Sequence, residues 1–271
     1  MKHIILIITI CLFPLLANAQ ASGGQVKRKS TNIQRHSKVV GSSSNKKKSK
    51  EDNSCKAVDL GLSVKWATCN VGAKVPWEYG DYFAWGEVDG YNVGKTTFYW
   101  STYKWCNGNF DTFTKYCSES SCGIVDYKQT LESIDDVATA YMGSAWRMPT
   151  HDEQLELLYK CYWEWTYNYK NSNRSGYIVY KAKTDADKGR KKYRGSYVTT
   201  TASYTINDVH IFLPVAGFNG NRFPGSSGHY WSSSLWYEPI NAWCLYFGEE
   251  YVSADKGNRC SGLSVRAVAV E

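Results

Sequence analysis

Short apolar runs, separated by clusters of Asn, Gly, Ser and Asp, fill the second half of this 271-residue chain. Runs of this length that are rich in β-branched and aromatic residues predict β-strands. In the last run, the apolar residues Leu263, Val265, Ala267 and Ala269 alternate with their neighbours, so this strand should be buried on at least one face. The predicted strands are 177–181, 209–214, 229–233, 242–247 and 263–270.

The segment that follows Cys55 predicts further β structure. Residues 58–67 read as a turn followed by a strand, and residues 81–86 read as a second, aromatic strand. Residues 89–129 are rich in Gly, Asn, Ser, Thr and Tyr and contain three cysteines. We expect an irregular excursion there, pinned by one disulfide bridge.

Two helices are predicted between these β regions. Asp135 and Asp136 precede the apolar stretch 137–142, where the helix dipole favours acidic side chains. Thr150 and Glu153 form a capping box for a second helix, which is expected to end near Trp163. Its buried face is predicted to carry Leu155, Leu158, Cys161 and Tyr162. Strands and helices without regular alternation predict an α+β fold, with two helices packed on mostly antiparallel strands.

The amino-terminal residues predict export. Lys2, an apolar stretch and the sequence Ala17-Asn18-Ala19 are typical of a signal peptide, 1–19, cleaved before Gln20. Lipidation of Cys11 is disfavoured because the bulky Ile10 precedes it. No later segment offers eighteen consecutive apolar residues, so no transmembrane segment is expected. The mature protein is predicted to be secreted, periplasmic or associated with the cell surface.

Composition then divides the mature chain into a tether, 20–54, and one domain, 55–271. The tether has few large apolar side chains and is expected to be disordered. Residues 1–50 contain ten Lys or Arg and no acid, which leaves 22 basic and 25 acidic residues in 51–271. A net charge of −3 on the domain argues against nucleic-acid binding. The lysines at 46–48 and 50 are typical of a solvated spacer, and the alternative is that they bind an anionic surface or a partner.

Eight cysteines remain after cleavage, and an even number in an exported chain predicts disulfides. Zinc is disfavoured because no C-x-x-C pair occurs and the histidines are scattered. We expect a Cys244–Cys260 bridge before the last strand, and a Cys69–Cys161 bridge from the first strand region to the capped helix. The pairing of the other four stays open: Cys55, Cys106, Cys117 and Cys122.

A series of motifs in collinear order resembles a known family. They are the stretches 58–62, 65–73, 78–87, 146–150, 211–217, 230–234, 241–247 and 262–266. Together they are similar to the Fibrobacter succinogenes major paralogous domain and cover roughly residues 55–271. The resemblance implies a C-type-lectin-like or formylglycine-generating-enzyme-like fold in an exported protein of Bacteroidota-type bacteria. The chain departs from the usual pattern in its insertion around 100–125 and in having both Cys244 and Cys260.

The chemistry in the sequence favours binding over catalysis. No catalytic residues are established for the family, and the sequence has no serine-hydrolase, zinc-protease or P-loop motif. Adjacent acids such as Glu249 and Glu250 do not form the facing pair of a glycosidase. The fold analogy keeps one enzyme as an alternative: an oxidase of the formylglycine-generating type, with Cys244 or Cys260 in a copper site. A structural subunit of a surface assembly is a second alternative.

No cofactor is expected, although one segment is similar to a calcium-binding sequence. Glu238-Pro239-Ile240-Asn241 is similar to the Glu-Pro-Asn ligand sequence of animal C-type lectins, with Glu249, Glu250 or Asp255 as further oxygen ligands. The additional Ile240 breaks the spacing of that sequence, and no Trp-Asn-Asp follows.

The predicted function is therefore non-enzymatic adhesion, through loops at about 217–260 that recognise an extracellular glycan or protein. Loops on a rigid frame commonly carry binding residues, and aromatic, Arg and amide side chains suit such a surface. Trp236 and Tyr237 are expected to be exposed. The candidate ligand-binding residues are Asn219, Asn221, Arg222, Trp236, Tyr237, Glu238, Asn241, Glu249, Tyr251 and Arg259.

Overall fold

The computed structural model describes residues 55–193, 202–219 and 225–270. The predicted signal peptide 1–19 and the tether 20–54 lie outside the described residues, as do Asn221 and Arg222. The described chain is mixed α+β with many strands and few helices, which confirms the predicted class. None of the helices in these ranges is long and apolar enough to span a membrane.

Both predicted helices form, and the predicted capping box of the second one is present. Helix α1 (Val137–Met142) begins at Asp136, whose Oδ1 accepts hydrogen bonds from the amides of Ala138 and Thr139. Helix α2 (His151–Lys160) begins with the capping box of Thr150 and Glu153. The prediction for its other end is wrong. The helix stops at Lys160, and Cys161 and Tyr162 open strand β4.

The early end of α2 has a tertiary cause. Trp163 donates from Nε1 to the carbonyl of Leu157, one of the last carbonyls of the helix, at 3.1 Å. Residues 161–166 then pair with an antiparallel strand along their whole length. Apolar spacing alone does not separate a helix end from the strand that follows it.

The strands form three small sheets. One has the order β1-β2-β11-β3, the second β10-β9-β8, and the third β6-β4-β5-β7. Every pair is antiparallel except β4 with β6. Their bounds are β1 Ala57–Val58, β2 Trp66–Asn70, β3 Trp146–Arg147, β4 Cys161–Thr166, β5 Gly176–Lys181, β6 Lys191–Lys192, β7 His210–Pro214, β8 Gly228–Leu235, β9 Asn241–Gly248, β10 Tyr251–Asn258 and β11 Arg266–Ala269.

The five strands predicted in the second half are present, whereas two other predictions needed correction. Residues 81–86 do not form a strand, and only Phe83 makes a bridge, to Leu263. The backbone turns away there because Gly80 and Gly86 have φ angles of 73° and 75°. Residues 251–258, which fall within the predicted loops at about 217–260, form β10, a hairpin partner of β9 in register over eight pairs.

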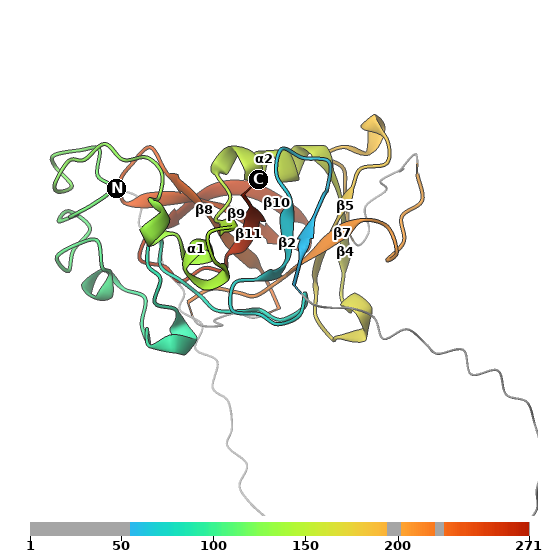
Figure 1. The fold of residues 1–271 in the computed structure, drawn as a ribbon, viewed down its shortest axis with the longest axis horizontal. Coiled ribbons are helices and arrows are strands. Elements are labelled where there is room, and N and C mark those ends of the chain that lie inside the picture. The colour runs from blue at the N-terminus through green and yellow to red at the C-terminus, as the bar shows by residue number, and fades with distance from the viewer. Residues whose placement is uncertain (1–54, 194–201, 220–224, 271) are drawn as a thin grey trace, which may run out of the picture. The chain divides into compact units, whose positions relative to one another are not determined.

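The middle sheet, β8–β10, separates the two main hydrophobic clusters. Figure 1 shows it in the centre of the domain with α2 above it, the β4–β5–β7 sheet on one side and the excursion of residues 89–129 on the other. Successive β9 residues point to opposite faces. Cys244 packs with Trp231 and Ala242 in one cluster, and Leu245 packs with Tyr230 in the other.

The excursion is built from turns and short 3-10 helices. Two of the 3-10 helices, η1 Tyr91–Val93 and η2 Trp100–Thr102, belong to it, and three more lie later, η3 Ser133–Asp135, η4 Tyr169–Asn171 and η5 Asp185–Asp187. Cys106, Cys117 and Cys122 are free thiols. The predicted disulfide therefore does not pin the excursion.

Candidate functional site

Four ring side chains meet at the connection between β8 and β9. Trp236 and Tyr237 follow β8, Trp243 lies on β9, and His151 is the first residue of α2. The Trp243 ring centroid lies 3.8 Å from that of Trp236, 5.8 Å from that of Tyr237 and 3.6 Å from that of His151, on which it is stacked. We call these four residues the ring platform.

Contacts of β9 with α2 and β8 fix the position of the platform. Trp243 lies on the α2 face of β9, and the start of α2 is fixed because the amide of His151 donates to Ser234 Oγ of β8 at 3.1 Å. Glu153, one turn into the helix, forms a two-point ion pair with Arg147. Burial lowers the pKa of His151, so its ring is neutral at pH 7 and stacks without a charge.

The exposed side of the platform carries two charged groups. Tyr237 is 77% exposed, whereas Trp236 is half-buried, so the prediction that both are exposed is right only for Tyr237. Lys256 of β10 lies 5.7 Å from the Trp236 ring centroid and 3.4 Å from the carboxylate of Glu238. Rings flanked by a carboxylate and an ammonium group can stack on a ligand and also form hydrogen bonds with its hydroxyl groups.

Arg259 is not a surface residue, so its assignment to ligand binding is wrong. It is 0% exposed and donates to the Tyr103 hydroxyl and to the carbonyls of Lys115, Tyr116 and Pro239. Its guanidinium is surrounded by aromatic rings, at 4.3 Å from the centroid of Phe113. Arg259 therefore fixes the excursion to the β8–β9 connection.

Two amide residues on the candidate list also have structural contacts. Asn241 is buried at the start of β9, and its backbone closes the β8–β9 turn with Trp236 and Glu238. Asn219 has a φ of 49° and accepts a hydrogen bond from the amide of Gly262 at 2.6 Å. Neither side chain belongs to the ring platform.

Glu249 and Tyr251 lie at the other end of the hairpin. Glu249 accepts a hydrogen bond from Tyr167, and the Tyr251 ring lies 4.8 Å from that of Tyr246. Eight residues of β9 separate this turn from Glu238, which corresponds to about 25 Å of extended chain. Glu238 and Glu249 therefore cannot share a calcium ion, as the sequence had suggested.

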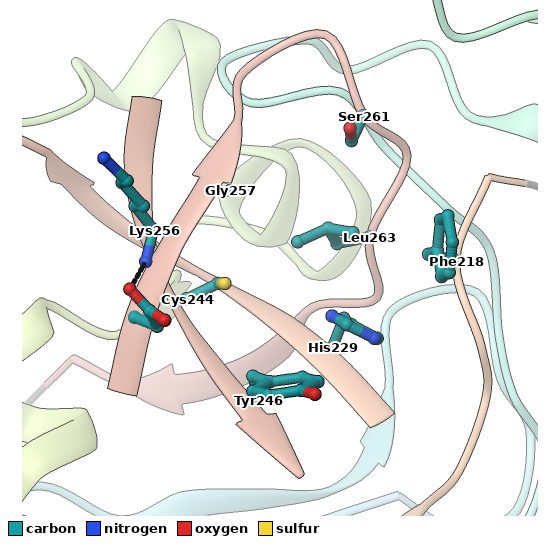
Figure 2. A pocket seen from close by; sticks show the side chains of 9 residues that line it. Phe218, His229, Cys244, Tyr246, Lys256, Gly257, Ser261 and Leu263 are labelled. Carbon is teal, nitrogen blue, oxygen red and sulfur yellow. Dashed lines mark hydrogen bonds between the residues drawn. The ribbon is translucent and has the colours of Figure 1, made fainter. Parts of the chain in front are cut away.

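The opposite face of the same sheet contains a pocket of about 420 Å³. Figure 2 shows the Cys244 thiol in the middle, with Tyr246, His229, Phe218 and Leu263 around it. Burial lowers the pKa of His229 to about 4, and its Nε2 lies 3.0 Å from Ser227 Oγ. The full lining is Phe218, His229, Cys244, Tyr246, Asp255, Lys256, Gly257, Ser261 and Leu263.

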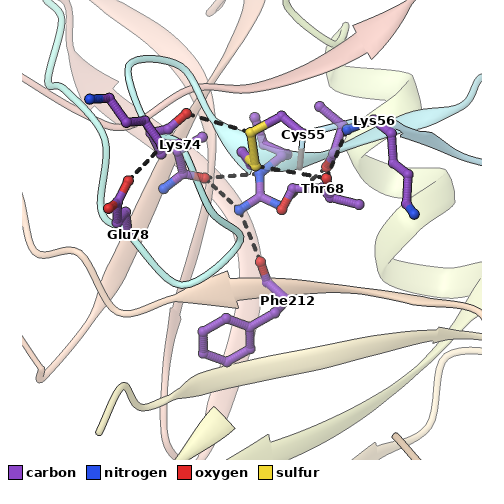
Figure 3. Close-up of a disulfide and its surroundings, with 11 residues drawn as sticks. Cys55, Lys56, Thr68, Lys74, Glu78 and Phe212 are labelled. Atoms are coloured by element: carbon purple, nitrogen blue, oxygen red, sulfur yellow. Dashed lines mark hydrogen bonds between the residues drawn. A yellow bond between two sulfur atoms is a disulfide. The ribbon is translucent and has the colours of Figure 1, made fainter. Parts of the chain in front are cut away.

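Cys69 forms its disulfide with Cys55, not with Cys161 (Figure 3). The cause is local. In the antiparallel register of β1 and β2, Ala57 pairs with Ala67, and two residues further out Cys55 faces Cys69 with a Cα–Cα distance of 5.3 Å. Cys161 is a buried free thiol at the start of β4.

The predicted Cys244–Cys260 bridge is also wrong, since both cysteines are free thiols. Cys244 packs with Trp231 on the pocket side of the sheet, whereas Cys260 packs with Tyr103 and Phe113 of the excursion. Burial raises the pKa of Cys244 to about 12 and that of Cys260 to about 11. Protonated thiols in two separate clusters do not suit the paired thiolates of a copper oxidase.

Sequence reasoning missed His151, Trp243 and Lys256 of the platform. Their sequence neighbours carry no binding motif, and only the packing of α2 and β10 on β9 brings them together. Comparisons of the chain with models of protein families, with curated proteins and with solved structures found no match.

Proposed function

We propose that this protein is an exported, non-enzymatic adhesion domain that binds a glycan on the ring platform of His151, Trp236, Tyr237 and Trp243. The observation that carries the proposal is the exposed ring of Tyr237, held against Trp236 and Trp243 at centroid distances of 5.2 and 5.8 Å. Rings placed outside a packed core at low entropic cost are typical anchors for ligands.

The platform offers both kinds of contact that a sugar requires. The faces of its rings can stack on the apolar face of a pyranose. At the edge of the platform, Glu238 can accept hydrogen bonds from hydroxyl groups, and Lys256 can donate hydrogen bonds to them. The side chains of Glu238 and Lys256 are 60% and 47% exposed. A saccharide is favoured over a flat protein surface because charged groups directly border the rings.

The sequence motifs support the other parts of the proposal, which are the form of the fold and the export of the protein. Their collinear order favours the C-type-lectin-like form of an α+β domain, and the amino-terminal sequence favours export. The run of lysines between 46 and 50 would associate the protein with an anionic cell surface. Neither calcium nor another cofactor is needed for stacking, so binding should persist when calcium is removed.

A glycan array probed with the full chain, with and without a calcium chelator, tests the proposal. Isothermal titration with a ligand from the array then gives the affinity. Trp236→Ala should weaken binding by about 2 kcal/mol, or about 30-fold, as expected for an aromatic hot spot. Tyr237→Ala should weaken it to a similar extent.

The matched control is Tyr127→Ala. Tyr127 is 74% exposed and lies in the excursion, and none of the ring contacts between described residues joins it to the platform. Its replacement should leave the affinity unchanged. An array without bound glycans, or equal affinities for the Trp236 and Tyr127 variants, would refute the proposal and favour a protein ligand or a structural role.

A further inference from the structure

We propose that the pocket formed by Phe218, His229, Tyr246 and Asp255 is a second site, and that it binds a small organic cation with an alkylammonium group. The pocket lies on the face of the β8–β10 sheet opposite the ring platform. Cys244 and Asp255 pair with each other across β9 and β10, and both line the pocket. The adjacent residues Trp243 and Lys256 also pair with each other, and their side chains lie on the platform side. The two sites therefore use different rings and different acidic side chains, although Lys256 borders both.

Charge is the first argument for a cation. Asp255 is the acidic residue in the lining, and its Oδ1 accepts a hydrogen bond from the amide of Lys256 at 2.7 Å. The Lys256 ammonium group lies on the other face, beside Glu238 and Trp236. Among the described residues no ion pair neutralises Asp255. His229 is neutral at pH 7 because burial lowers its pKa to about 4. The pocket therefore carries a negative charge.

The rings are the second argument. Phe218, His229 and Tyr246 form a continuous wall, with centroid distances of 5.3 Å between Phe218 and His229 and 4.8 Å between His229 and Tyr246. Burial raises the pKa of Tyr251, behind Tyr246, to about 12, so its phenol is also neutral. Neutral ring faces attract an ammonium group through their quadrupoles, and desolvation strengthens this attraction.

The shape of the floor is the third argument. Leu263 and the protonated Cys244 thiol offer an apolar surface that suits methyl or methylene groups. Gly257 keeps this floor open, since a side chain there would begin 3.6 Å from Cys244 Sγ and 2.8 Å from the Trp231 ring. A volume of about 420 Å³ is in the range of small-molecule sites.

Titration of the full chain with choline, followed by NMR and calorimetry, tests this assignment. The neutral isostere 3,3-dimethylbutan-1-ol has the same shape without the charge. Choline should bind at least about tenfold more tightly than the isostere, since an ion pair and cation–π contacts are both lost with the charge. Asp255→Asn should weaken choline binding by about tenfold or more, and Tyr246→Leu should also weaken it.

Asp152→Asn is the matched control, because the Asp152 side chain is 95% exposed at the start of α2, outside the pocket. It should leave choline binding unchanged, as should Trp236→Ala, which removes only the platform. Thermal unfolding of each variant shows whether it is folded. Equal affinities for choline and the isostere, a neutral Asp255→Asn substitution in a folded protein, or binding of neutral sugars in place of choline would overturn the assignment.

Discussion

Arg266 of β11 donates two hydrogen bonds to one atom, the side-chain oxygen of Asn70 on β2, from Nε at 2.9 Å and from Nη2 at 2.6 Å. The same guanidinium also donates to the carbonyls of Ala67, Thr68 and Phe212. Burial lowers the pKa of Arg266 to about 10, so it remains charged at neutral pH. One side chain thus connects β11 with β2 and β7.

Replacing Asn70 with Ala should destabilise the protein by about 3 kcal/mol, because a buried charge loses its main acceptor. Arg266→Lys should cost a similar amount, since an ammonium group cannot reproduce the planar set of donors. Denaturant unfolding measures both effects. Arg190→Ala, at an exposed arginine, is the control and should stay within about 0.5 kcal/mol of the wild type. A similarly small effect at Asn70 would contradict the proposed role.

The Cys55–Cys69 disulfide closes a loop with a sequence separation of 14 residues. Its removal in a Cys55→Ala, Cys69→Ala double variant should lower the free energy of unfolding by about 3 kcal/mol, through greater freedom of the unfolded chain. Peptide mapping without reduction should recover the two cysteines in one linked peptide, and Cys244 as a free thiol. Recovery of a Cys69–Cys161 or a Cys244–Cys260 peptide would show that the assignment is wrong.

His229 should make stability depend on pH. An unfolded histidine binds its proton near pH 6.5, whereas the buried His229 binds it only near pH 4. Between these values the unfolded state holds more protons, so the free energy of unfolding should fall by up to about 3 kcal/mol as the pH decreases through this window. His229→Gln should remove this part of the slope in denaturant titrations from pH 7 to pH 4. An unchanged slope in the variant would assign the effect to other groups.

Trp236 and Tyr237 should differ in their contribution to stability. Trp236 is half-buried and its ring centroid lies 3.8 Å from that of Trp243, whereas Tyr237 is largely exposed. Trp236→Ala should therefore cost about 1 kcal/mol and Tyr237→Ala less than about 0.5 kcal/mol. Thermal unfolding at one protein concentration compares them. Equal losses would mean that the two rings are packed to a similar degree.

Local signals in the sequence determined much of the secondary structure. The start of α1 after Asp136 and the capping box at Thr150 were predicted because the helix dipole and backbone capping each depend on a few adjacent residues. The apolar runs that became β5, β7, β8 and β9 were recognised because burial requires apolar side chains. The polar strand β10 gave no such signal, since an edge strand is held by backbone hydrogen bonds to β9 that any side chain permits.

The site depended on contacts between distant segments. Sequence reasoning placed Trp236, Tyr237 and Glu238 near a ligand, but Arg259 in the same region turned inward, because backbone carbonyls and aromatic rings of the excursion could satisfy its charge. The Cys55–Cys69 pairing followed from the register of β1 and β2, which the positions of the cysteines do not reveal. The sequence by itself determined where the chain could form helices, caps and apolar strands. Only the tertiary structure decided which polar and aromatic side chains remained on the surface, because that depends on partners far away in the chain.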